Sequence, residues 1–244
     1  GEENLTWYID AGMSLYKLGE EARVLLADFG LEGSERRELR QSHNRAERDG
    51  LTFELVAPPA SDALFQEVAT ISNAWLATKN AQEKGFSLGR FGIDYVRRFP
   101  LALVREHGRL TAFANVFVTD TRAEATIDLM RHLPDGSRVT MDFLFVELML
   151  ALKSQGYKEF NLGMAPLAGL ADHPQARAWD RLGTYLYRHA GHFYNFDGLR
   201  RFKAKFDPTW KPKYLVAPGG LDPLIVTVDI AALISGGLGG MVRR

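Results

Sequence analysis

The sequence contains no cysteine among its 244 residues. This absence excludes disulfide bonds, catalysis by a thiolate and zinc sites built from cysteine. The 30 lysines and arginines balance the 30 aspartates and glutamates, so net charge gives no reason to expect a nucleic-acid partner. Any anionic partner must therefore be recognised by local clusters of basic side chains.

The sequence also lacks a visible signal peptide and an uninterrupted apolar run long enough to cross a bilayer. The longest apolar stretch, 224–241, is interrupted by Asp229 and by four glycines. We expect it to form a short helix and a tail that pack on the protein or lie at a membrane interface. The composition, 46% hydrophobic and 25% charged, is sufficient for a sizeable core.

The first 50 residues are predicted to contain two strands and a helix. Apolar runs predict strands at 7–9 and 22–29. A helix is predicted at 34–50, beginning at Ser34 and ending at Gly50. Arginines cover its polar surface, but acidic residues offset them, which favours a solvated helix with ion pairs.

The remaining sequence predicts an α/β (α+β) protein. The order from residue 53 is β-α-α-β-β-β-α-β-α-β, which is the pattern of the GCN5-related acyltransferase fold. The predicted strands are 53–59, 101–107, 109–119, 124–130, 158–163 and 213–217. The predicted helices are 61–78, 92–98, 141–156, 174–190 and 197–206.

A phosphate-binding glycine turn is missing from this pattern. Acetyl-CoA enzymes of that fold carry an R-x-x-G-x-G turn before the central helix, where backbone amides hold pyrophosphate. The corresponding junction, 130–143, contains one glycine, Gly136. This difference favours an acyl donor other than acetyl-CoA.

Asp128, Arg131 and His132 end the strand that enters this junction. Open sheets build their sites at strand ends. Asp128 has apolar neighbours and needs a partner, which is either Arg131 in a structural pair or a ligand ammonium. We favour the ligand. His132 could act as a general base, although a histidine beside a loop is more often incidental.

Two other polar residues have both a structural and a functional interpretation. Asp142 opens the central helix, where it either contacts a ligand or faces the positive end of the helix dipole. Asn161 lies near the end of the next strand, where it either lines a site or shapes the loop that follows.

The segment 200–213 has six basic residues against one acid, Asp207. Aromatic residues alternate with them, a combination that can bind phosphates and stack on bases. The alternative places the aromatic rings in the core and the lysines in water. For most of these lysines we favour the solvated alternative, and one of them remains a candidate ligand of phosphate or carbonyl oxygen.

The segments 19–33, 39–50, 127–135, 141–170 and 199–215 resemble the cytosolic catalytic domain of the phosphatidylglycerol aminoacyltransferases, the multiple peptide resistance factor proteins. Within that family the sequence is most similar to the alanyl-phosphatidylglycerol synthases. The resemblance implies two acyltransferase-like modules in tandem, as in the Fem peptidyl transferases. It assigns 1–50 to the end of the first module and a connecting helix, 51–220 to the catalytic second module, and 221–244 to a C-terminal helix and tail.

The resemblance also implies a reaction. An aminoacyl group, alanyl or lysyl, would pass from aminoacyl-tRNA to a glycerol hydroxyl of phosphatidylglycerol, with no metal and no cofactor. The product would lower the negative charge of the membrane and give resistance to cationic antimicrobial peptides. The implied partners are the tRNA, the lipid, an anionic membrane surface and an upstream transmembrane segment, with this domain on the cytoplasmic side of the bacterial inner membrane.

Catalytic roles are expected for three residues under this interpretation. Lys203 would stabilise the developing oxyanion or bind the lipid phosphate, and Arg131 would bind phosphate. Asp128 would receive the aminoacyl ammonium or the proton of the attacking hydroxyl. The expected substrate-binding residues are Tyr95, Lys205, Asp142, Asn161 and Arg201.

Other interpretations remain open. Tyr95 has apolar neighbours at helical spacing, so it could belong to the core instead. A Fem-like enzyme would use the same donor on a peptidoglycan precursor. A binding module would hold tRNA without chemistry and would tolerate the loss of Asp128. An acetyl-CoA enzyme is a weaker third alternative, because the glycine turn is missing.

Overall fold

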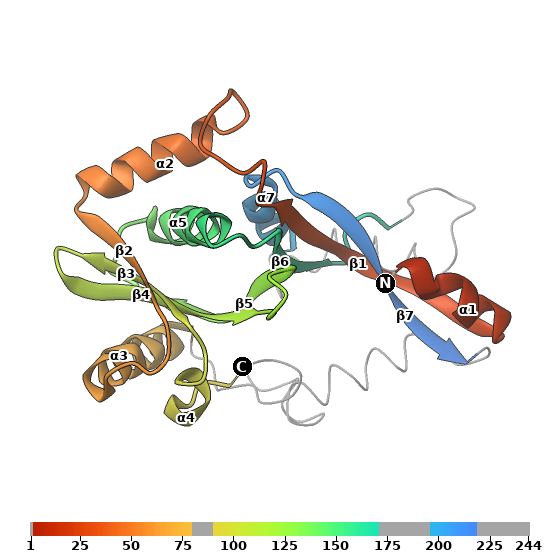
Figure 1. Cartoon of the computed structure of the whole chain (residues 1–244), viewed down its shortest axis with the longest axis horizontal. Coiled ribbons are helices and arrows are strands. Elements are labelled where there is room, and N and C mark those ends of the chain that lie inside the picture. The colour runs from red at the N-terminus through yellow and green to blue at the C-terminus, as the bar shows by residue number, and fades with distance from the viewer. Residues whose placement is uncertain (1, 80–89, 171–195, 219–244) are drawn as a thin grey trace. The chain divides into compact units, whose positions relative to one another are not determined.

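The computed structural model describes residues 2–79, 90–170 and 196–218 (Figure 1). The chain divides into two compact units. Among the described residues, we call 25–79 with 90–160 the Asp128 unit, and 2–24 with 161–170 and 196–218 the Lys203 unit. The predicted helix at 174–190 and the apolar stretch 224–241 lie outside the described residues.

The Asp128 unit contains an antiparallel sheet in the order β2-β3-β4-β5. Figure 1 shows α3 and α4 on one side of these strands and α2 and α5 on the other. The strands are β2 (Leu51–Val56), β3 (Leu101–Glu106), β4 (Arg109–Val118) and β5 (Glu124–His132). The helices are α2 (Arg37–Arg48), α3 (Asp62–Lys79), α4 (Ile93–Val96) and α5 (Thr140–Ser154).

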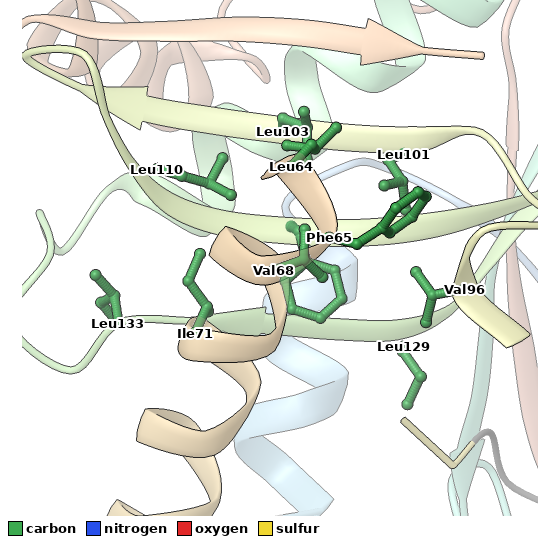
Figure 2. Close-up of a cluster of buried hydrophobic side chains, with 11 residues drawn as sticks. Leu64, Phe65, Val68, Ile71, Val96, Leu101, Leu103, Leu110, Leu129 and Leu133 are labelled. Atoms are coloured by element: carbon green, nitrogen blue, oxygen red, sulfur yellow. The ribbon is translucent and has the colours of Figure 1, made fainter. Parts of the chain in front are cut away.

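The core of this unit lies where α3 and α4 cover the sheet. Strand β4 buries every residue from Leu110 to Val116, because helices cover both of its faces. Figure 2 shows Val68 and Ile71 of α3 directed toward the strands, with Val96 of α4 beside them. This layer therefore fixes α4 against β5, the strand that carries Asp128.

The Lys203 unit contains three neighbouring strands in the order β6-β1-β7. Strand β1 pairs antiparallel with β7, and this register is irregular between Lys17 and Gly19. A side chain at Gly19 would collide with the carbonyl of Ala165. The φ angle of Gly19, 153°, is also one that glycine adopts more readily than other residues. The strands are β1 (Met13–Leu25), β6 (Glu159–Pro166) and β7 (Thr209–Pro218), and the helices are the short 3₁₀ helix η1 (Glu2–Asn4), α1 (Leu5–Asp10) and α7 (Phe196–Ala204).

The predicted α/β class and the predicted order of elements are confirmed within the described residues. The first 50 residues differ in detail. The predicted strand at 7–9 lies in α1, which ends before Gly12, a residue with a φ of 75°. Strand β1 begins at Met13 instead of 22, because its charged residues find partners in the sheet and so break the apolar pattern. Helix α2 is preceded by Arg36 rather than Ser34, whose hydroxyl donates to Glu35.

No helix among the described residues is long and apolar enough to cross a membrane.

We expect Leu103→Ala to lower the free energy of unfolding by about 2–5 kcal/mol, because Leu103 is 1% exposed and its loss leaves a cavity in the layer of Figure 2. Leu25 is 50% exposed and gives a matched control. Leu25→Ala should change the same free energy by about 0.5 kcal/mol or less. Urea denaturation measures both changes, and equal losses would contradict this location of the core.

Candidate functional site

Asp128 lies at an irregularity of the sheet. In the β4–β5 ladder Ala114 pairs with Met130, but Val116 pairs with Ile127, so Asp128 and Leu129 both lie opposite Asn115. An extra residue of this kind is a β-bulge, which redirects side chains. Leu129 belongs to the core cluster under α3, and Asp128 contacts α4. The bulge thus turns two consecutive side chains toward the same side of the sheet.

Tyr95 of α4 is the partner of Asp128. Its hydroxyl donates to Asp128 Oδ2 over 2.6 Å. Burial, together with the hydrogen bond and the charge of Asp128, raises the pKa of Tyr95 to about 12. At neutral pH the phenol therefore keeps its proton and acts as a donor to the carboxylate. Tyr95 also packs against the core cluster, so its role in substrate binding stays a prediction.

Arg131 lies on the same side of the sheet, and it is only 4% exposed. Its Nη1 donates to Ser72 Oγ of α3 over 2.5 Å. Its guanidinium lies over the rings of Trp75 and Phe91, with 5.0 and 5.7 Å from Cζ to the ring centroids. Aromatic faces attract a cation, and the attraction grows when water is excluded. This enclosure fixes a charged group on the strand that carries Asp128.

Lys203 is the buried cation of the other unit. It lies on α7 and is 6% exposed, and its Nζ donates to the carbonyl of Met164 on β6 over 2.8 Å. Burial lowers the pKa of Lys203 to about 8, although the negative charge of Glu21 opposes this shift. A lysine with this pKa is mostly charged at neutral pH but releases its proton easily.

Glu21 accepts several hydrogen bonds in the same unit. It lies on β1, between β6 and β7, so donors reach it from both neighbouring strands. Arg23 Nε lies 2.7 Å and Lys213 Nζ 2.8 Å from its carboxylate, and the Asn161 side chain also donates to it. Burial raises the pKa of Glu21, but the three donors outweigh burial and lower the pKa overall. Glu21 therefore places a stable negative charge near Lys203.

The predicted residue Asn161 belongs to this cluster, and it also shapes the loop. Its Oδ1 accepts the N–H of Gly163 over 2.8 Å. Gly163 has a φ of 79°, and a Cβ there would lie 3.7 Å from Lys203 Nζ. Asn161 thus shapes the loop and contacts Glu21, and its role in lining a substrate site stays a prediction.

The other predicted residues lie in more ordinary surroundings. Asp142 is 8% exposed and accepts from Ser42 over 3.0 Å, which joins α5 to α2. Lys205 Nζ lies 5.7 Å from the centroid of the Phe202 ring, and Arg201 donates to the carbonyl of Asp197 on its own helix. Their roles in substrate binding stay predictions. His132 Nδ1 lies 3.0 Å from the carbonyl of Leu133.

Sequence reasoning missed the residues that support the predicted ones: Glu21, Lys213, Ser72, Trp75 and Asn115. Ser72 and Trp75 are three residues apart on α3, a spacing that places both on one helix face. That spacing is the signal that could have identified them as contacts of a neighbouring strand. Within the described part of the chain, no group of three or more histidines and carboxylates is placed to hold a metal ion.

Comparison with known proteins gives consistent matches. The family model described as "Phosphatidylglycerol lysyltransferase, C-terminal" matches residues 1–217. The phosphatidylglycerol lysyltransferase of Bacillus subtilis is 40% identical over 214 residues, which are 87% of this chain and 25% of that protein. The enzyme of the same name from Staphylococcus aureus strain MSSA476 is 34% identical over 88% of this chain and 26% of its own length. The chain thus spans about a quarter of these relatives.

Solved structures agree with these matches. The crystal structure of a C-terminal domain assigned to a lysylphosphatidylglycerol synthetase from Agrobacterium fabrum has a TM-score of 0.83 and 47% identity, and covers 97% of this chain and 71% of that one. The structure of L-PGS from Bacillus licheniformis has a TM-score of 0.79 and 36% identity, and it covers 95% of this chain and 70% of that chain.

The lowered pKa of Lys203 predicts a pH dependence of stability. Between the folded pKa of about 8 and the ordinary 10.5, the unfolded chain binds a proton that the folded chain does not. Unfolding takes up this proton, so the Lys203 contribution to stability rises with pH in that window, and the penalty for burying the charge is fully present below it.

Lys203→Met removes this penalty. We expect the difference in free energy of unfolding, variant minus wild type, to be largest below pH 8 and to fall as the pH approaches 10.5. Denaturation curves of both proteins from pH 7 to 10.5 measure it. A difference that stays constant across that range would show that Lys203 keeps its ordinary pKa.

Proposed function

Because this chain belongs to the phosphatidylglycerol lysyltransferase C-terminal family, we propose that it is the catalytic domain of an aminoacyltransferase that acts on phosphatidylglycerol. The main support for this proposal is the match of residues 1–217 to that family. The acyl donor is aminoacyl-tRNA, and the acceptor is a glycerol hydroxyl of the lipid. The curated relatives are named as lysyltransferases, so lysine is the first amino acid to test, with alanine second.

The reaction exchanges one ester for another. The lipid hydroxyl oxygen forms a bond to the aminoacyl carbonyl carbon, and the bond from that carbon to the ribose oxygen of tRNA breaks. The proton of the lipid hydroxyl finally resides on the ribose oxygen. The donor ester is already activated, so positioning and charge stabilisation are sufficient sources of rate.

Lys203, Asp128 and Arg131 each have a proposed role that their surroundings support. Lys203 is a cation largely shielded from water, where an ammonium stabilises a developing oxyanion strongly. Asp128 carries a carboxylate that the Tyr95 hydroxyl orients, which suits the ammonium of the aminoacyl group. The planar guanidinium of Arg131 has several N–H donors, which suits it to bind a phosphate of lipid or tRNA.

The acceptor lipid defines the place of action. We propose that the domain works at the cytoplasmic face of the bacterial inner membrane, next to a transmembrane segment of the same protein. Adding an amino acid to phosphatidylglycerol brings a positive ammonium to an anionic lipid. The membrane surface then attracts cationic peptides less strongly, which would give resistance to cationic antimicrobial peptides.

The test is a transfer assay with the full-length protein. We would supply tRNA charged with labelled lysine or alanine and vesicles that contain phosphatidylglycerol, then measure the label in the lipid fraction. Lys203→Ala should lower the transfer rate about 10²–10³-fold, the usual effect of removing one group that stabilises an oxyanion. Lys211→Ala, which removes the same charge from the same basic segment, should leave the rate close to wild type.

The outcomes separate the alternatives. Equal losses in Lys203→Ala and Lys211→Ala would indicate a general need for positive charge and would contradict a specific role for Lys203. Label in a peptidoglycan precursor instead of the lipid would support a Fem-like enzyme. Binding of tRNA with no transfer of either amino acid would support a binding module. Phosphatidylcholine vesicles, which lack the free glycerol hydroxyl, are the matched control for the acceptor.

A further inference from the structure

Asn115 is a fully buried polar residue opposite the bulge that carries Asp128. Its exposed fraction is 0%, and it lies on β4 in register with Leu101 of β3. Its Oδ1 accepts the backbone N–H of Leu129 over 2.7 Å. In a regular ladder a backbone carbonyl would accept that N–H, but the bulge interrupts the ladder there. The Asn115 side chain therefore fixes the backbone directly after Asp128.

The other end of the same amide lies close to Tyr95. Nδ2 is buried and completes no hydrogen bond with any atom of the described residues. It is nevertheless near enough to the Tyr95 oxygen to lower the pKa of the phenol, against the larger effects of burial and Asp128. Buried donors without a partner are rare in folded proteins, which suggests that this donor has a use.

The Tyr95 oxygen is a suitable acceptor for this donor. Its proton points to Asp128 Oδ2, so its lone pairs remain available to an N–H group. When a cationic ligand binds Asp128, the carboxylate is attracted both to the Tyr95 hydroxyl and to the N–H groups of the ligand. A hydrogen bond from Asn115 Nδ2 to the phenol oxygen would keep Tyr95 in place while the Asp128 carboxylate interacts with the ligand.

We propose that Asn115 is the positioning residue of the Tyr95–Asp128 pair: its Oδ1 fixes the bulge that carries Asp128, and its unpartnered Nδ2 is the donor that steadies the oxygen of Tyr95. This inference rests on the proposed function for its effect on catalysis, since Asp128 there binds the aminoacyl ammonium. Its structural part, the contact between the amide and the phenol, can be tested without any activity.

The first test is spectroscopic and leaves Asn115 unchanged. The side-chain NH₂ resonances of Asn115 are followed by ¹⁵N NMR in the wild type, in Tyr95→Phe and in Tyr157→Phe. Tyr95→Phe removes the acceptor oxygen and should shift both NH₂ resonances. Tyr157→Phe, on the loop after α5, should leave them in place. If Tyr95→Phe also leaves them in place, the proposal is wrong.

The second test is a double-mutant cycle in the transfer assay with the full-length protein. Asn115→Asp keeps an oxygen for the Leu129 N–H but removes the donor. It should lower kcat about tenfold in the wild type, with a smaller change in KM, and should have no further effect in Tyr95→Phe. Thr111→Val is the control, because Thr111 is also buried on β4 but donates to Val104.

A negative result has a different meaning in each of the two tests. Losses from Asn115→Asp and Tyr95→Phe that simply add would show that Asn115 acts on folding and would overturn the positioning role. If no transfer occurs in the wild type while Tyr95→Phe shifts the Asn115 resonances, the proposed function fails and the contact between amide and phenol stands.

Discussion

The candidate site of the Asp128 unit depends on a break in strand register. Side chains alternate between the two faces of a strand, so Asp128 and Leu129 would face opposite sides in a regular ladder. The bulge opposite Asn115 removes this restriction. Leu129 can then pack in the apolar layer under α3 while Asp128 reaches Tyr95 on α4. The same irregularity therefore allows both the contact between Asp128 and Tyr95 and the packing of Leu129 in the core.

Both units also meet the cost of burying charge, in different ways. Around the Arg131 guanidinium, two aromatic faces and the hydroxyl of Ser72 take the place of water. Lys203 has one carbonyl acceptor and a more distant negative charge at Glu21, and its pKa falls. The first residue is suited to holding an anion permanently. The second is suited to chemistry in which a proton or a charge changes during the reaction.

The sequence was a good guide to the elements and to the family, and a poorer guide to partners. Asp128 could be singled out because a charged residue between apolar neighbours at a strand end is unusual, whereas Lys203 stood out only through its basic segment and the family resemblance. The Asp128 unit shows why partners were harder: Tyr95 and Asp128 are far apart in sequence, and their contact depends on a bulge that no local pattern reveals. Glu21 was missed because three separate strands create its surroundings. Strand β1 was predicted to start too late for a related reason, since paired charges inside a sheet look like a loop in sequence.

The enclosure of Arg131 also bears on which ligands the Asp128 unit can choose. Two aromatic rings lie close to the Arg131 guanidinium, so the anion proposed to bind there would be met by the N–H groups along the edge of the guanidinium. An edge of that kind matches two oxygens on one phosphorus or carbon atom and fits a single rounded anion such as chloride poorly. A lysine at this position would keep the charge but lose that discrimination. Selectivity for the shape of an anion would then depend on the rings of Trp75 and Phe91, which orient the guanidinium without contacting the anion.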